Sequence, residues 1–183
     1  MILAAAMRAI ADRGPEQLTM SAVARSAGVS RPTLYRWFPT KADLLLAIGR
    51  YAEEQFDAGL QRLVEEHPDP SARLGAALRY LVSYLDEAVG PDPIGVDPAF
   101  ALRSLAASLA PHVEALARLL GDALDEVPAV RSGALSREGA AELFLRLAYS
   151  HYLVPHADPD ALLADLRALA GLIGCVAAPV SRP

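Results

Sequence analysis

Several features that would assign the chain to other classes of protein are scarce in the sequence. Cys175 is the only cysteine, so neither an intrachain disulfide nor a cysteine-based zinc site can form, and a reducing cytoplasm fits. No apolar run reaches the roughly 18 to 20 residues that span a bilayer. No basic segment precedes the apolar residues 2–13 as it would in a signal peptide. We therefore expect a cytoplasmic protein without membrane contact.

Signals for β-structure are equally rare. Hydrophobic residues make up 53% of the 183 positions, but most are Ala and Leu at helical spacing, and alternating β-branched runs are almost absent. This pattern predicts an all-α protein, long enough for one sizeable core or for a small domain fused to a larger one. The expected helices are 2–13, 20–27, 31–38, one from Thr40 to Glu66, 71–89, 98–109, 111–126, 137–154 and 159–177.

Motifs of catalysis and metal binding are missing as well. The sequence has no nucleophile elbow, phosphate loop or paired-carboxylate pattern. Its four histidines are scattered, and His151 and His156 lie five residues apart with Pro155 between them, not at the i, i+4 spacing of a helical metal pair. We expect no metal site, no cofactor and no enzymatic activity.

Charge is distributed unevenly along the chain. Residues 1–50 contain seven Lys or Arg and three acidic residues, a net charge of +4, so the remainder carries −9 of the total of −5. A basic head on an acidic body is what we expect of a protein that touches DNA through one end only. We call residues 1–48 the head, a predicted DNA-binding domain, and residues 49–183 the body, predicted to bind a ligand and to dimerise.

The stretch from Leu18 to Ile48 has the pattern of a helix-turn-helix followed by the start of a long helix. Gly28 can adopt the backbone angles that the tight turn between the two short helices requires. Hydroxyl side chains stand where helices 20–27 and 31–38 begin, and a Thr–x–x–Asp capping box opens the long helix. The capping residues are Thr19, Ser30 and the pair Thr40 and Asp43.

This stretch resembles the TetR family of bacterial transcriptional regulators. The elements that match the family signature are Thr19, Ala24 to Ser30 (ARSAGVS), Thr33-Leu34-Tyr35, Phe38, Lys41 and Leu44. The resemblance implies a fold of about nine helices with an amino-terminal DNA-binding head, and the rest of the chain carries no motif of comparable specificity. Family members commonly have a short, often basic arm ahead of the first helix; here its contacts are absent or the natural start lies upstream.

By that resemblance, residues 31–38 form the recognition helix, which enters the major groove of DNA. The candidates for base contacts are Arg31, Pro32, Thr33 and Arg36. The candidates for phosphate contacts are Thr19, Ser30, Tyr35 and Lys41, the only lysine of the chain. Each has a simpler reading, since the hydroxyls can serve only as helix caps and an exposed Arg can be merely solvated. Trp37 can either pack beneath the helix or lie along the DNA backbone.

Aromatic residues of the body suggest a binding cavity. Tyr80 and Tyr84 lie on one face of helix 71–89, and a mainly apolar cavity with a few polar groups is a typical small-molecule site. The candidate lining residues are Tyr80, Tyr84, Phe100, Arg103, Phe144 and Tyr149. The alternative is that they are ordinary core and rim residues.

The last two predicted helices, 137–154 and 159–177, are apolar over much of their circumference. A helix that is apolar on more than one face must be buried on more than one side. A second copy of the protein can supply that burial, or the helices can be central in a monomer's own core.

These observations lead to one hypothesis with two alternatives. The first is a homodimeric repressor that an unknown, largely apolar small-molecule effector releases from a palindromic operator, with two heads about 34 to 36 Å apart to reach successive major grooves. The second is a small-molecule-binding or catalytic helical bundle with a vestigial head. The third is a purely structural dimerisation module.

Overall fold

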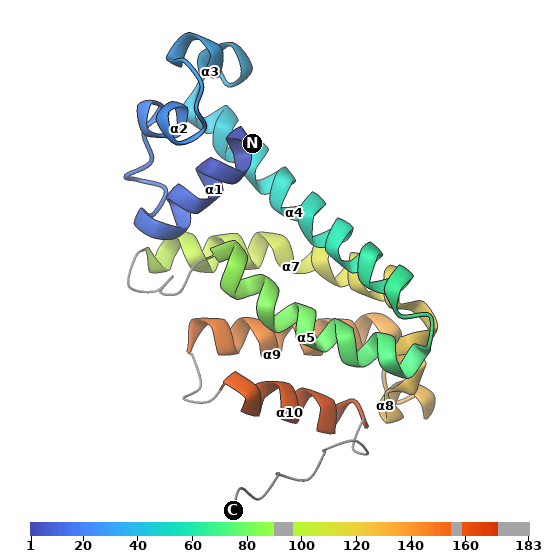
Figure 1. The fold of residues 1–183 in the computed structure, drawn as a ribbon. Helices are drawn as coiled ribbons and strands as arrows, with labels where there is room; N and C mark the ends of the chain where they lie inside the picture. Colours follow the sequence, from blue (N-terminus) through green and yellow to red (C-terminus); the bar gives the residue numbers. More distant parts are fainter. Residues whose placement is uncertain (90–96, 155–158, 172–183) are drawn as a thin grey trace, which may run out of the picture.

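The computed structural model describes residues 1–89, 97–154 and 159–171, and every regular element in these ranges is helical (Figure 1). The elements are α1 (Ile2–Arg13), α2 (Met20–Ser26), α3 (Arg31–Trp37), α4 (Lys41–Glu66), α5 (Pro70–Val89), α7 (Pro98–Leu120), the 3-10 helix η1 (Gly121–Glu126), α8 (Pro128–Arg131), α9 (Arg137–Leu153) and α10 (Pro159–Leu169). Helices α1, α2 and α3 gather at one end of the long α4, and the remaining helices lie beyond them (Figure 1). The predicted all-α fold is confirmed.

Side-chain caps fix where the head helices begin. The Thr19 hydroxyl accepts a hydrogen bond from the backbone N–H of Ala22 at 3.1 Å, and the Ser30 hydroxyl accepts one from that of Thr33 at 3.2 Å. At the start of α4 both halves of the capping box formed by Thr40 and Asp43 are present. Each cap satisfies an amide that the first turn of a helix leaves without a partner. The predicted caps are confirmed.

The turn between α2 and α3 depends on Gly28. Its φ of +68° lies in the left-handed region, where a Cβ is unfavourable. A Cβ built at this position meets nothing within 4 Å, so the backbone conformation, and not a lack of space, favours glycine here.

Two separate clusters of buried side chains form the hydrophobic interior. The body cluster is the larger and includes Phe56, Leu60 and Leu63 of α4. Along α4 the change from one cluster to the other falls between Ile48 and Phe56. The buried residues of the head cluster are Ala6, Leu18, Met20, Val23, Ala24, Leu34, Leu44 and Ile48.

Helix α7 corrects the predicted break near residue 110. It continues through Pro111, which is exposed. A proline inside a helix removes one backbone hydrogen bond, but here Leu105, His112 and Leu116 are buried in the body on both sides of it. The apolar face therefore holds the helix together. It ends at Gly121, whose φ is +51°.

The region after α7 also differs from the prediction. Residues 121–126 form η1 in place of the end of an α-helix, and α8 lies between the predicted helices 111–126 and 137–154. The last predicted helix extends to residue 177, but its part after residue 171, with Cys175, lies outside the described residues.

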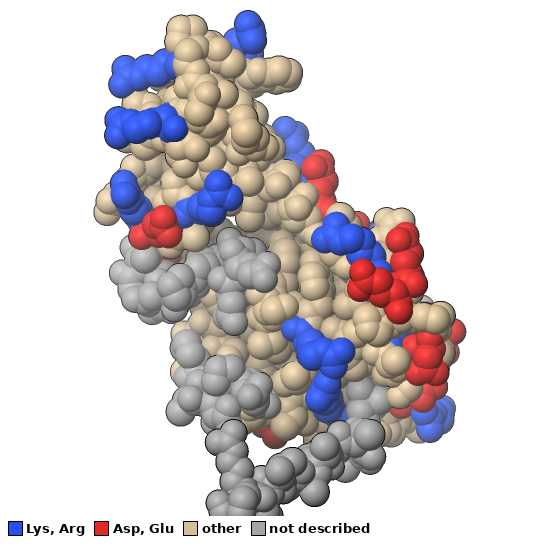
Figure 2. Space-filling view, in the orientation of Figure 1, with Lys and Arg blue, Asp and Glu red and all other residues tan. Residues whose placement is uncertain are grey.

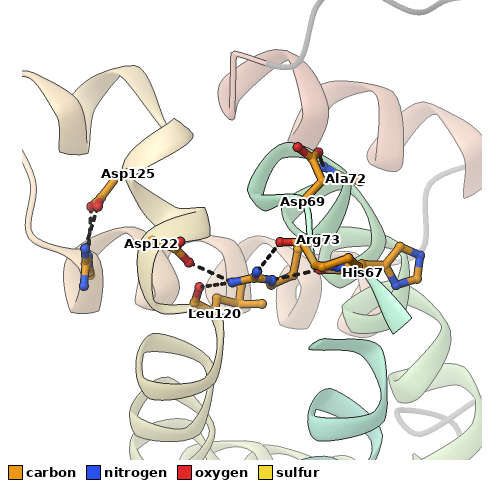
Figure 3. Close-up of polar contacts among 9 residues, drawn as sticks. His67, Asp69, Ala72, Arg73, Leu120, Asp122 and Asp125 are labelled. Carbon is orange, nitrogen blue, oxygen red and sulfur yellow. Dashed lines mark hydrogen bonds and ion pairs between the residues drawn. The ribbon is translucent and has the colours of Figure 1, made fainter. Parts of the chain in front are cut away.

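The far end of α4 is tied to the end of α7 by Arg73 of α5 (Figure 3). Its guanidinium donates to the carbonyl oxygens of His67 at 3.0 Å and Pro68 at 2.6 Å, and pairs with the carboxylate of Asp122 at 2.7 Å. The Arg73 side chain is only 13% exposed. Bonds of a guanidinium to carbonyl and carboxylate oxygens at such sites are among the stronger hydrogen bonds in proteins. This end of α4 is therefore fixed to the body.

None of the described helices combines the length and apolar character needed to cross a membrane. Within the same residues, no group of three or more His, Cys, Asp or Glu side chains is arranged to hold a metal ion.

Candidate DNA-binding surface and ligand cavity

The outer face of α3 presents the predicted DNA-contacting residues. Its inner face is anchored by Leu34, which is completely buried. Trp37 is 65% exposed, so it does not pack beneath the helix. The residues exposed on the outer face are Arg31, Pro32, Tyr35 and Arg36, with Thr33 half-buried.

Basic side chains project from this end of the molecule on the face that Figure 2 shows. In Figure 2, Lys and Arg side chains project from the helices at the upper end, whereas Asp and Glu side chains lie mostly over the lower part of α4 and the helices beside it. On this face the upper end is mainly basic, whereas the lower part carries both signs, and the positive end suits a polyanion.

Three of the predicted phosphate contacts already have partners within the protein. The hydroxyls of Thr19 and Ser30 cap α2 and α3, and that of Ser30 also lies 2.8 Å from the hydroxyl of Thr33. Lys41 Nζ donates to the carbonyl oxygen of Glu16 at 3.1 Å and so ties the α1–α2 connection to α4. An ammonium has three hydrogens, so two remain for a phosphate. Their contacts with DNA remain predictions.

A cavity of about 270 Å³ lies where the head meets the body. Head helix α1 and the first half of α4 form one wall, and α5, α7 and α9 form the others. Most of the lining is apolar. The head and α4 contribute Met7, Ile10, Ala11, Gly14, Leu45, Ile48, Gly49, Ala52 and Glu53; the rest are Tyr84, Leu85, Asp97, Phe100, Ala101, Ser104, Leu105, Ala107, Ser108, His112 and Tyr149.

Three of the six predicted lining residues are in this wall, namely Tyr84, Phe100 and Tyr149. The structure places the other three, Tyr80, Arg103 and Phe144, outside it. The contributions of α1 and α4 to the wall were not predicted, because they depend on how the head packs against the body.

The three residues outside this wall have different environments. Arg103 is exposed, and Phe144, only 4% exposed, belongs to the body core. The Tyr80 ring lies against Gly59, and its hydroxyl donates to the Phe56 carbonyl oxygen at 3.1 Å. A Cβ at Gly59 would overlap that ring, so glycine allows α4 and α5 to approach closely here.

His112 is the most unusual lining residue. It is 5% exposed, its ring stacks on Phe56 with 3.9 Å between centroids, and its Nδ1 lies 2.8 Å from the Tyr149 hydroxyl. Nε2 is buried and has no hydrogen-bond partner among the described residues. Burial lowers the pKa of His112 to about 4, so the ring is neutral at pH 7. A buried polar group without a partner costs about 1–3 kcal/mol.

Little in the local sequence indicates the role of His112. His112 interrupts an Ala- and Leu-rich helix and occupies the same face as Leu105 and Leu116. A polar side chain on an apolar face was the only local signal, because its partner Tyr149 is 37 residues away.

Tyr84 provides a second polar group in the wall. Its hydroxyl donates to the carbonyl oxygen of Ala52 at 2.8 Å, which ties α5 to α4. Burial raises the pKa of Tyr84 to about 12, and the nearby carboxylates of Glu53 and Asp57 add to that shift. The pKa of Tyr149 is also raised, mainly by burial. Both phenols are therefore protonated at neutral pH.

Comparison with known proteins identifies the head. Residues 2–48 match the family of bacterial regulatory proteins described as the tetR family. The fold of nearly the whole chain is similar to that of the TetR family repressor AlkX from Dietzia sp. strain DQ12-45-1b, with a TM-score of 0.59 and 25% identity over 93% of this chain and 94% of AlkX. Residues 2–48 therefore form a TetR-family domain.

Other relatives agree over shorter stretches or in fold. The HTH-type transcriptional regulator EthR from Mycobacterium tuberculosis is 38% identical over 68 residues, which are 37% of this chain and 32% of EthR. The matches with curated relatives such as this one span about a third to two fifths of those proteins. AibR, in a complex with isovaleryl coenzyme A and operator DNA, has the same fold, with a TM-score of 0.57 and 20% identity over 93% of this chain and 95% of AibR.

The TetR-family match ends at residue 48, which is also the last residue of the head core. Helix α4 continues for 18 residues beyond it, to Glu66. The cavity straddles this junction, since its lining includes Ile48 and both earlier and later residues of α4.

Proposed function

We propose that this protein is a transcriptional repressor, and not an enzyme, that binds a palindromic operator as a homodimer and releases it when a small molecule occupies the cavity. AlkX is described as a repressor, and AibR was crystallised with both a coenzyme A thioester and operator DNA. AlkX supports the proposed repression, and AibR supports the proposed binding of both a small molecule and operator DNA.

The observation that carries the proposal is the position of the cavity. A ligand in it would contact Met7 and Ile10 of α1, Leu45 of α4, and side chains of the body at the same time. Its affinity then depends on how the head is placed relative to the body. A ligand that binds one placement better than another shifts the population toward it.

The anchoring of α4 gives this coupling a direction. Arg73 fixes the carboxyl-terminal end of α4 to the body, whereas the amino-terminal end carries the head. A helix of 26 residues is about 39 Å long. A small rotation about the fixed end therefore produces its largest displacement at α3 and would change the spacing of two heads in a dimer.

Exposed leucines on the last two helices support the proposed dimer. Leu143 and Leu147 of α9 are 48% and 37% exposed, and Leu169 of α10 is 61% exposed. Residues four apart on a helix share one face. We propose that these helices pair with those of a second copy; sedimentation as a monomer at micromolar concentration would contradict this part.

The proposed assignment of DNA contacts follows the exposed face of α3 and its surroundings. Arg can bind guanine through two hydrogen bonds, and Pro or Thr can contact a thymine methyl group. We assign base contacts to Arg31, Pro32, Thr33 and Arg36, and phosphate contacts to Thr19, Ser30, Tyr35 and Lys41.

Selection of genomic DNA fragments with the purified protein tests the proposal, followed by measurement of affinity for the selected fragment. Arg36→Ala should weaken binding to that fragment about tenfold or more, whereas Arg62→Ala, which removes an exposed charge near the carboxyl-terminal end of α4, should have little effect. If no fragment binds better than bulk DNA, the proposal fails and a ligand-binding bundle with a vestigial head is favoured.

A further inference from the structure

The unpartnered nitrogen of His112 indicates the chemistry of the ligand. The described residues leave Nε2 of His112 as a buried side-chain atom with no hydrogen-bond partner, in a side chain that lines the cavity. Buried polar groups are normally paired. An unpaired one at the wall of a cavity can be satisfied by a bound molecule.

Tyr149 determines whether Nε2 donates or accepts. The neutral imidazole carries one N–H hydrogen, on either Nδ1 or Nε2. In the hydrogen bond of 2.8 Å between Nδ1 and the Tyr149 hydroxyl, the donor can therefore be either Nδ1–H or the hydroxyl. If the hydroxyl donates, only Nε2–H is left unpaired. If Nδ1–H donates, both Nε2 and the hydroxyl hydrogen of Tyr149 lack partners. The first arrangement leaves fewer buried groups unsatisfied, so Nε2 is the donor.

The charges of the wall argue against an anionic ligand, and the Nε2–H donor of His112 argues against a ligand that has only donors. Among the described lining residues, Glu53 and Asp97 are acidic and none is Lys or Arg, so an anion would approach carboxylates without a cation to balance it. An alkylammonium ion has only donors and cannot accept a hydrogen bond from Nε2–H. A neutral molecule that has an acceptor meets both conditions.

We propose that the cavity binds a small, neutral, mainly apolar molecule whose carbonyl oxygen accepts a hydrogen bond from Nε2 of His112. Ketones, esters and amides belong to this class. The volume of about 270 Å³ is near the lower end of the range for small-molecule sites, about 300–1,000 Å³, so the molecule is compact. The role of such a molecule as effector rests on the proposed function, but its binding does not.

The ligand class can be tested on the full-length protein without DNA. The fluorescent ketone 6-propionyl-2-(dimethylamino)naphthalene, prodan, serves as the probe, and 2-decanone, decanoate and decylammonium compete with it. The ketone should displace prodan at a concentration at least tenfold below that of either ion. Equal or better displacement by decanoate or decylammonium would overturn the assignment of a neutral ligand, and failure of prodan to bind would do the same.

The hydrogen bond to His112 is tested by His112→Phe, which keeps a ring against Phe56 and removes both nitrogens. After correction for the altered affinity of prodan, 2-decanone should bind about tenfold more weakly than to the unaltered protein, and the affinities of the two ions should not change. An unchanged affinity for 2-decanone would overturn the role of His112.

A third measurement does not depend on the folding of a variant. In protein labelled with ¹⁵N at histidine, the spectrum of His112 should show Nε2 as the protonated nitrogen, and its signal should shift when 2-decanone is added. A proton on Nδ1 would reverse donor and acceptor and overturn the proposal. If a neutral ketone binds as described but does not release the operator, the proposed function is wrong and the inferred ligand class stands. If only a carboxylate releases the operator, the proposed function stands and the inferred ligand class is wrong.

Discussion

The head and the body use polar side chains in opposite ways. In the head, Thr19, Ser30 and Thr40 each bind a backbone amide three residues further along the chain, and none of its described residues is both polar and buried. In the body, hydrogen bonds join His112 to Tyr149 and Tyr84 to Ala52, across 37 and 32 residues. Local bonds make the head a preformed docking unit, whereas long-range bonds around a cavity make the body sensitive to what the cavity contains.

The largest expected effect is on the free energy of unfolding, and it tests whether the head core and the body core unfold separately. Leu34→Ala removes a completely buried side chain from the head and should lower the free energy of unfolding by about 2–5 kcal/mol. Hydrogen exchange should show lost protection in α1–α3 and retained protection in α5 and α9. Leu102→Ala, which truncates an exposed leucine of α7, is the control and should change little. Equal loss of protection in head and body would show that the two cores unfold as one.

Acid should weaken the body through His112. Its pKa is about 4 in the folded protein and 6.5 when unfolded, so below pH 6.5 the unfolded chain binds a proton that the folded chain does not. The stabilisation is complete above pH 6.5 and is lost as the pH falls toward 4, by about 3 kcal/mol in total.

Denaturant unfolding at several pH values measures this loss. His112→Phe should flatten the dependence of the unfolding free energy between pH 6.5 and 4. An equally steep loss in that variant would assign the acid sensitivity to other groups.

The anchor of α4 should contribute more than an exposed ion pair of the same type. Arg73→Ala removes bonds to the carbonyl oxygens of His67 and Pro68 and to the Asp122 carboxylate, and should cost about 2 kcal/mol of stability. Arg137→Ala breaks the exposed pair with Asp125 and should leave the melting temperature nearly unchanged (Figure 3). Similar losses for both variants would show that Arg73 is not a special anchor.

The smallest expected effect concerns a phosphate contact of the head. Lys41→Ala should reduce the slope of log affinity for DNA against log salt concentration by about one unit. Lys41→Arg, which keeps the charge, is the matched control and should retain the slope. An unchanged slope for Lys41→Ala would mean that Lys41 only holds the carbonyl oxygen of Glu16.

The same contrast explains how much the sequence could predict. Caps and the turn at Gly28 are set by residues within three or four positions of one another, so the head elements were predicted almost to the residue. In the body, the tendency of proline to interrupt a helix predicted a helix end near Pro111. Helix α7 nevertheless continues, because residues on both sides of Pro111 are buried in the body. Packing between distant segments overrode the local signal.

The cavity was predicted only in part for the same reason. Tyr84 and Phe100 were identifiable as aromatic residues of a presumed bundle, but the part played by α1 depends on how the head docks on the body. His112 acquires its character from Phe56 and Tyr149, which no short stretch of sequence contains.

The central claim, that the cavity couples ligand binding to DNA binding, is tested most directly by measuring both affinities reciprocally. A ligand that displaces prodan from the cavity is titrated into the protein with and without its selected DNA fragment, and the fragment is titrated with and without the ligand. If the cavity couples the two sites, ligand and DNA should each weaken binding of the other by the same factor, about 5- to 150-fold. Two affinities that do not depend on each other would contradict this claim.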